Sequence, residues 1–254
     1  MAELVADLRA ETVSLEELLH PLREEDWERP TPAEGWAIRD QVSHLAWFDD
    51  LAVRAATDRA GYDAALEGFG SVDDLALESR GMPVTELREW FRTSRARSIE
   101  TFATLDARDR LPWFWREMSA ASFVTARLME TWAHGQDVAD ALGVTREPTA
   151  RLRHVAQLGY RARAYSFVAH GLPVPADQVR VELTLPGGAT WTAGPADADG
   201  VVRGTMLDFC LAVTQRIHLS DTGLDLTGEP ARAWMRIAQA FAGAPGRGRA
   251  PASG

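Results

Sequence analysis

Apolar residues recur at helical spacing along most of the first 145 residues. Four stretches follow this pattern: residues 3–20, 38–59, 84–105 and 119–142. Pro21 ends the first stretch and Gly143 the last, as these residue types commonly do. Residues 61–82 are rich in Gly, Asp and Glu, which favours an irregular crossover. Four long helices with a long connection between the second and third predict a four-helix bundle.

After this region the pattern becomes a mixture of helices and strands. Residues 179–185 alternate apolar and polar side chains, which is the signature of a half-buried strand. The pattern also predicts strands at 190–192 and 200–202 and helices at 149–170, 204–218 and 230–242. We therefore expect a mainly α chain in three parts: a bundle over 1–145, a small α+β domain over 146–243 and a disordered tail over 244–254.

Composition and charge argue against several kinds of partner and against a disulfide. The formal net charge of −10 repels a phosphate backbone, so we expect no nucleic-acid partner. No uncharged apolar run of 18 residues exists, and the N-terminus lacks a signal-peptide pattern, so we expect no membrane partner. Cys210 is the one cysteine and cannot form an internal disulfide, which fits a cytoplasmic protein. It lies in an apolar run and is expected to be a buried structural thiol.

Glu130 and His134 form the first candidate for chemistry. They are four residues apart on one predicted helix, so their side chains point the same way. His44 lies beside the apolar stripe of another predicted helix. Two imidazoles and a carboxylate suit Zn, Fe, Ni or Co, and three protein ligands leave positions open, as in catalytic sites. The alternative is a solvated Glu–His pair with no metal.

Two segments resemble the metal motifs of the DinB-like superfamily. Thr31–Leu45 contains His44, and Glu130–Val138 contains Glu130 and His134. More narrowly, nearly the whole chain resembles the mycothiol-dependent maleylpyruvate isomerase family, within its actinobacterial metal-binding branch. The resemblance implies a DinB-like four-helix bundle with a divalent ion held by the two histidines and the glutamate. Zinc is favoured, with nickel, iron or cobalt as alternatives.

The resemblance also implies a low-molecular-weight thiol such as mycothiol as cosubstrate. A metal with an open position stabilises a thiolate near neutral pH, so the chain would act as a thiol transferase or isomerase on a small electrophilic substrate. The family uses an arginine for the anionic substrate, and Arg216 in Thr214–Ile217 is the candidate. Its alternative role is that of a surface or domain-interface arginine. Asp137 either orients His134 or an adjacent group, or serves as a cap or domain-interface residue.

Other functions stay open at this point. One alternative is a metal-dependent hydrolase or a biosynthetic lyase or cyclase that needs no thiol, and another is a non-catalytic metal-binding protein. The sequence shows no Ser-His-Asp motif, phosphate loop or dinucleotide fingerprint. The substrate, the native metal and the choice between monomer and homodimer are not determined by the sequence. Four tryptophans near the motifs either line a pocket or pack in the core: Trp36, Trp47, Trp113 and Trp115.

Overall fold

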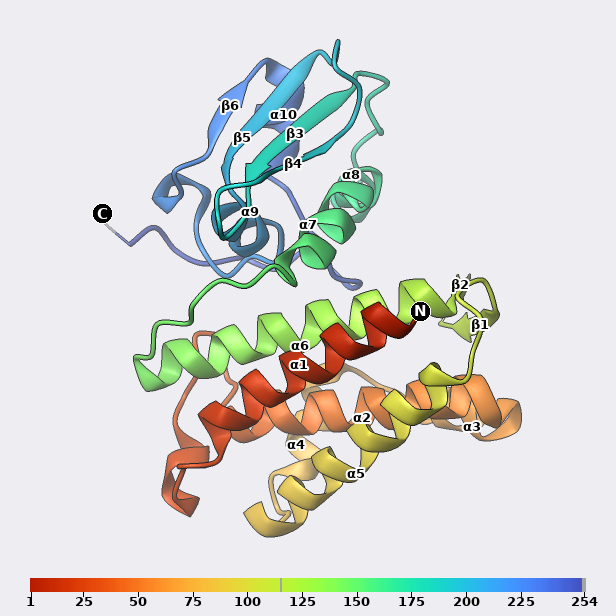
Figure 1. The fold of residues 1–254 in the computed structure, drawn as a ribbon. Helices are drawn as coiled ribbons and strands as arrows, with labels where there is room; N and C mark the ends of the chain where they lie inside the picture. The colour runs from red at the N-terminus through yellow and green to blue at the C-terminus, as the bar shows by residue number, and fades with distance from the viewer. Residues whose placement is uncertain (115, 253–254) are drawn as a thin grey trace. The chain divides into compact units, whose positions relative to one another are not determined.

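The computed structural model describes residues 1–114 and 116–252 (Figure 1). The chain divides into two compact units, Met1–Arg146 and Glu147–Gly254. The fold is mainly helical, with an α+β second unit, as the sequence predicts. Residues 244–252 contain no helix or strand, and the last two residues of the predicted disordered tail lie outside the described part. No helix among the described residues is long and apolar enough to cross a bilayer.

Four long helices form the bundle of the first unit (Figure 1): α1 (Ala2–Leu19), α2 (Ile38–Thr57), α5 (Val84–Ala103) and α6 (Ala120–Leu142). Helix α2 packs against α5 and α6, and α1 packs against the same two helices. Ser119 begins α6 by accepting a hydrogen bond from the Ser122 amide, and Gly143 ends it with a φ of 67°. The four helices predicted from apolar periodicity are confirmed.

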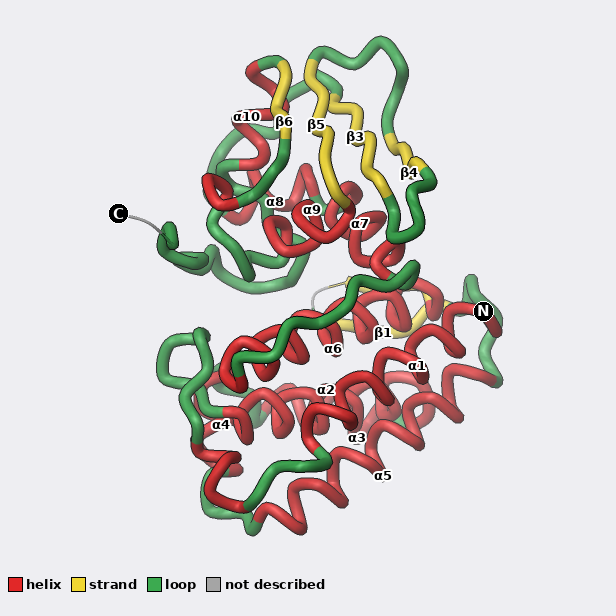
Figure 2. The backbone as a smooth tube through the Cα atoms, turned by 60° about the vertical axis from the view of Figure 1, so that its left-hand side comes forward, coloured by secondary structure: helices red, strands yellow, loops and turns green. Residues whose placement is uncertain are grey.

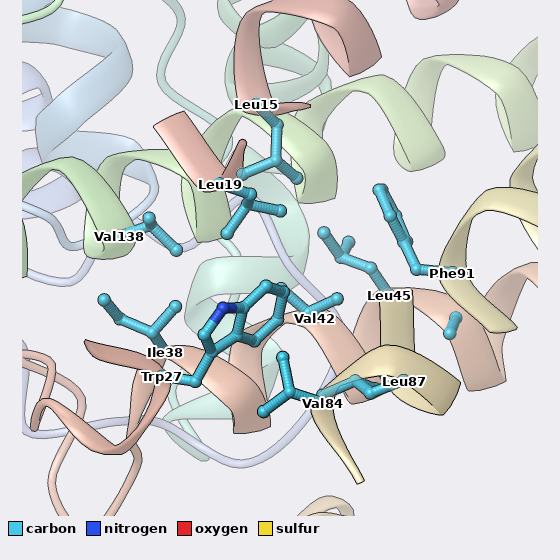
Figure 3. Close-up of a cluster of buried hydrophobic side chains, with 11 residues drawn as sticks. Leu15, Leu19, Trp27, Ile38, Val42, Leu45, Val84, Leu87, Phe91 and Val138 are labelled. Carbon is cyan, nitrogen blue, oxygen red and sulfur yellow. The ribbon is translucent and has the colours of Figure 1, made fainter. Parts of the chain in front are cut away.

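An apolar cluster at one end of the bundle holds the start of α2 (Figure 3). Its centre is the fully buried Trp27 from a short 3-10 helix, Glu24–Glu28, that precedes α2. All four bundle helices contribute to it, with Leu15, Leu19, Ile38, Val42, Leu45, Leu87, Phe91 and Val138 among its members. Each large apolar side chain buried in this way stabilises the fold by about 1.5–3 kcal/mol. The cluster therefore fixes the helix that carries His44.

A buried polar network crosses the middle of the bundle and takes one residue from each long helix. Asp49 of α2 accepts from Arg95 Nε of α5 at 2.6 Å and from Arg127 Nε of α6 at 3.0 Å. Arg95 Nη1 also donates to Thr12 Oγ1 of α1 at 2.6 Å. The sequence patterns did not predict this network, because its members are far apart in the chain.

The crossover at 61–82 is more regular than its composition suggests, so that prediction was wrong. Two short helices, α3 (Arg59–Glu67) and α4 (Val72–Ser79), occupy most of it. Asp58 caps α3 by accepting from the Gly61 amide, and Ser71 caps α4 by accepting from the Asp74 amide. Asp58 and Ser71 thus act as N-caps, a role that both residue types favour.

A short antiparallel hairpin, β1 (Arg110–Trp113) with β2 (Arg116–Ser119), precedes α6. The sequence indicated only a break in the helical pattern here. Phe114 has a φ of 45°, which is unusual for a bulky residue. Its amide donates to the Tyr62 hydroxyl of α3 at 2.6 Å, which holds this turn against the crossover. Trp115 lies outside the described residues.

The second unit packs helices against a four-stranded sheet in the order β4-β3-β5-β6 (Figure 2). The strands are β3 (Val179–Thr184), β4 (Thr190–Ala193), β5 (Gly200–Thr205) and β6 (Asp225–Thr227). The helices are α7 (Leu152–Arg161), α8 (Arg163–Ala169), α9 (Met206–Val213), the 3-10 helix η2 (Leu219–Asp221) and α10 (Glu229–Met235). Strand β3 is parallel to β5, while the other neighbours are antiparallel.

Three predicted elements of this unit are longer than the real ones, and β6 was not predicted. The helix predicted over 149–170 is two helices, α7 and α8, that meet at Ala162. The two later helices end earlier than their apolar patterns suggest, at Val213 and Met235. Gln215 takes a φ of 59°, outside the right-handed helical region, so the chain cannot continue α9 there.

Candidate metal centre

Three side chains from two bundle helices bring their ligand atoms together. His44 lies on α2, and Glu130 and His134 lie on α6, and one ligand atom of each falls within 4.8 Å of the others. Glu130 Oε2 is 3.6 Å from His44 Nε2 and 3.1 Å from His134 Nε2. The two imidazole centroids are 4.4 Å apart. Within residues 1–114 and 116–252 this is the one such group of three His, Cys, Asp or Glu residues.

The separations fit a single divalent ion. Zinc ligands lie about 2.0–2.2 Å from the ion in a tetrahedral arrangement, which puts neighbouring ligand atoms about 3.4 Å apart. The observed 3.1 and 3.6 Å separations from Glu130 Oε2 lie on either side of that value. One carboxylate and two imidazoles are also the donor types that zinc, nickel, iron and cobalt accept.

The protonation states also suit a metal. Burial lowers the pKa of His44 to about 4, and the neighbouring His134 acts in the same direction. His44 is therefore neutral near pH 7, as a metal ligand must be. Burial opposes ionisation of Glu130, but its contacts with His134 and His44 outweigh this effect and hold the pKa of that carboxyl well below its usual range. His44 thus offers a metal ion a nitrogen lone pair, and Glu130 offers it a negative charge.

A hydrogen-bonded chain continues from His134 away from the ligand atoms. His134 Nδ1 is hydrogen-bonded to Gln41 Oε1. Gln41 Nε2 donates to Thr31 Oγ1 at 2.8 Å, and Thr31 Oγ1 donates to the Trp36 carbonyl at 2.9 Å. Asp137 was the candidate for orienting His134, but its Oδ2 is 4.0 Å from Nδ1, so Gln41 holds the direct position. Sequence reasoning missed Gln41, although it lies one turn before the histidine of the first motif.

Aromatic rings surround the ligand set on several sides. The Trp36 ring stacks on His134 with centroids 6.1 Å apart and lies 5.6 Å from His44. Phe48 lies 4.6 Å from His44. Further rings continue from Phe48: Trp47, Phe69, Trp113 and Phe114. Of the four tryptophans marked in the sequence, Trp36 contacts the ligand rings and two others contact Phe48. The fourth, Trp115, is not in the described part of the chain.

Two residues singled out in the sequence belong to the second unit. Arg216 follows α9, and its Nη1 donates to the Thr214 carbonyl at 2.6 Å. The structure leaves its substrate role as a hypothesis. Cys210 is buried in α9 with its thiol 3.4 Å from the Leu152 carbonyl. Burial raises the pKa of this thiol well above its usual value, which agrees with a structural role.

Comparison with known proteins shows the relationship directly. The family model described as the mycothiol maleylpyruvate isomerase N-terminal domain matches residues 8–139. The chain belongs to the mycothiol maleylpyruvate isomerase family. Two uncharacterised proteins of Mycobacterium tuberculosis, from strains H37Rv and CDC 1551, are each 49% identical to this member over 250 residues. Those matches cover 96% of this chain and 97% of each relative.

Two crystal structures have a similar fold. That of the mycothiol-dependent maleylpyruvate isomerase matches with a TM-score of 0.60 and 17% identity, over 89% of this chain and 92% of that one. A histidine-to-alanine mutant of that isomerase matches with a TM-score of 0.59 and 15% identity, over 88% and 92%. These matches confirm the expected fold, a DinB-like bundle followed by an α+β region, for this family member.

Proposed function

We propose that this protein is a metal-dependent enzyme that uses a low-molecular-weight thiol of the mycothiol type. Its reaction would be cis–trans isomerisation of, or S-transfer to, a small electrophilic substrate. The observation that carries the proposal is the convergence of His44, Glu130 and His134 within 4.8 Å, in a family named for a mycothiol-dependent isomerase. Zinc fits best, and nickel, iron and cobalt suit the same donors.

The residues of the chain have separable tasks in this proposal. His44, Glu130 and His134 would hold the ion, and three protein ligands leave a position open. When bound, a divalent ion favours the thiolate form of a thiol near neutral pH. The rings of Trp36 and Phe48 exclude water from the ligand set, which strengthens the electrostatic interactions there.

The chemistry expected of the thiol is addition to a carbon of an activated double bond. Rotation about the resulting single bond, followed by loss of the same thiol, completes an isomerisation and returns the thiol unchanged. Retention of the new carbon–sulfur bond gives S-transfer. We assign Arg216 to the anionic group of the substrate, on the likeness of its segment to that of the family.

Metal content is the first test. Protein purified without a metal-affinity tag should carry about one divalent ion per chain by elemental analysis. A His44→Ala/His134→Ala double variant should carry almost none, whereas His170→Ala should match the wild type, because His170 lies outside the ligand cluster and bonds to the Ser166 carbonyl. Equal and negligible metal in all three proteins would refute the metal centre.

Thiol dependence is the second test. Cobalt-substituted protein should gain a sulfur-to-metal charge-transfer band when mycothiol is added, with release of about one proton per site. Maleylpyruvate is the first electrophile to try, since the related isomerase is named for it. Full turnover of a substrate in thiol-free buffer would refute the thiol role and favour a hydrolase or lyase. Metal and thiol binding without turnover of any electrophile tested would favour a binding protein.

A further inference from the structure

We propose that Gln41 is a positioning residue that sets the tautomer of His134, so that the ring presents its Nε2 lone pair to the metal position. The proposal rests on the metal centre above and deepens it. Thr31 and the Trp36 carbonyl orient the Gln41 amide through two further hydrogen bonds. We call the hydrogen-bonded chain from His134 through Gln41 and Thr31 to the Trp36 carbonyl the relay. Its three members other than His134 lie between positions 31 and 41, in one segment of the chain.

The Trp36 carbonyl can only accept a hydrogen bond, and this fixes which group donates at each step of the relay. The Trp36 carbonyl has no hydrogen, so the Thr31 hydroxyl must donate across their 2.9 Å contact. The Thr31 oxygen is then the acceptor in its 2.8 Å contact with Gln41, which must present its NH2 group there. Turning the amide around would give the hydroxyl two acceptors for one hydrogen.

The same logic fixes the hydrogen on His134. The NH2 group of Gln41 is committed to Thr31, so its carbonyl oxygen faces His134 Nδ1 and accepts from it. A neutral imidazole with its hydrogen on Nδ1 has a bare lone pair on Nε2. That lone pair meets Glu130 Oε2, another acceptor, 3.1 Å away. Two acceptors at this distance need a cation between them, either a proton on Nε2 or a metal ion at the metal position.

The two histidines are unequal in this respect. A metal-bound histidine commonly donates its second ring nitrogen to a fixed partner, and such partners contribute about 10–100-fold to metal affinity. His44 Nδ1 is buried and has no hydrogen-bond partner among the described residues, and the rings of Trp36 and Phe48 hold it in place. His134 has the relay, and the other nearby acceptor, Asp137 Oδ2, lies 4.0 Å from Nδ1, beyond hydrogen-bond distance, so the loss of Gln41 removes the hydrogen bond that orients the ring.

Burial shows that Gln41 is not a surface residue that meets His134 by chance. It has no exposed surface, and both ends of its amide are hydrogen-bonded inside the bundle. A buried amide with both ends satisfied holds one orientation, because rotation would leave polar atoms unpaired.

The experiment compares wild type with Gln41→Leu, Gln41→Glu and a control, Gln136→Leu. Gln136 lies on α6 close to His134 but bonds to Asp140. Nitrogen NMR of the metal-free proteins should show a hydrogen on Nδ1 of His134 in wild type and control, whether or not Nε2 also carries one. In Gln41→Leu a substantial fraction of His134 should carry its hydrogen on Nε2 alone. Zinc affinity, from competition with a chelator, should fall about 10–100-fold in Gln41→Leu. Gln41→Glu should stay within a few-fold of wild type, because a carboxylate still accepts from Nδ1.

The outcomes separate a positioning role from a structural one. Loss of thermal stability in Gln41→Leu with unchanged tautomer and zinc affinity would overturn the proposal. Thr31→Val is the milder variant if Gln41→Leu fails to fold, and it should shift tautomer and affinity in the same direction by a smaller factor. If wild type binds no zinc, the metal centre fails, and the His134 tautomer in the metal-free proteins still decides the role of Gln41.

Discussion

The buried position of Asp49 makes Asp49→Ala a sharp test of how the bundle is held together. Asp49 lies 2.6 Å from Arg95 Nε and 3.0 Å from Arg127 Nε. The three side chains are 0%, 2% and 4% exposed, in that order. Alanine would remove the carboxylate that accepts hydrogen bonds from two buried guanidinium groups at once. Burial lowers the pKa of Arg95, and Asp49 opposes this shift, so the desolvation cost is present and is compensated by Asp49.

We expect Asp49→Ala to lower the free energy of unfolding by a large amount. Removing one partner of a buried ion pair costs about 3–5 kcal/mol, because the remaining charge is left without compensation. Two charges are affected here, so we expect a loss at the upper end, about 4–5 kcal/mol. Folded domains are stable by about 5–15 kcal/mol, so Asp49→Ala should be folded only marginally. An Asp49→Leu/Arg95→Met/Arg127→Met triple variant should recover much of the loss, since apolar replacement of a whole buried ion cluster is often close to neutral.

Equilibrium unfolding in urea gives the free energy of unfolding that tests this prediction. The control is Asp63→Ala, whose partner Arg59 is exposed, and we expect a change below about 1 kcal/mol there. A free energy of unfolding for Asp49→Ala within 1 kcal/mol of wild type, at an unchanged urea slope, would refute the reasoning. If the single variant fails to fold, a folded triple variant would support it, and a triple variant that also fails to fold would contradict it.

Three further predictions follow from single sites. Glu130→Gln removes the negative ligand and should lower zinc retention at least tenfold in a chelator competition, and equal retention would contradict its role as a ligand. The Cys210 thiol should react with a thiol reagent at pH 8 only after unfolding, since burial raises its pKa. Because the unfolded thiol ionises near about pH 8.5, stability should fall above that pH, and Cys210→Ala should lack this component. Gly159→Ala would place a Cβ 2.7 Å from Val213 Cγ2 and should cost about 1–3 kcal/mol by thermal unfolding. Gly68→Ala meets open space and serves as its control.

The long helices could be predicted from the sequence because their information is local. An apolar stripe repeats every three or four residues within one segment, so the pattern needs no knowledge of the partner. The helix starting at Ile38 and the one ending at Leu142 are examples. Short elements carry too few repeats for this signal, and α3, α4 and the β1–β2 hairpin were therefore missed. Asp58 and Ser71 were the available signals, since both residue types favour the N-cap position.

The polar interior could not be predicted, because its pairs are distant in the chain. Asp49 meets Arg95 across 46 positions and Arg127 across 78. A charged residue on a helix is usually solvated, so single arginines carry no signal of burial. Only the packing of four helices shows that these charges compensate one another.

The candidate metal centre could likewise be predicted from the sequence only in part. Glu130 and His134 share a helix face by their spacing, and His44 joined them through the resemblance of its motif. The orientation of the His134 ring depends instead on Gln41, 93 positions away. The proposed ligands alone therefore do not define the site. A chain that keeps the two histidines and the glutamate but has an apolar residue at position 41 should bind a metal more weakly, because its His134 would be free to present either ring nitrogen.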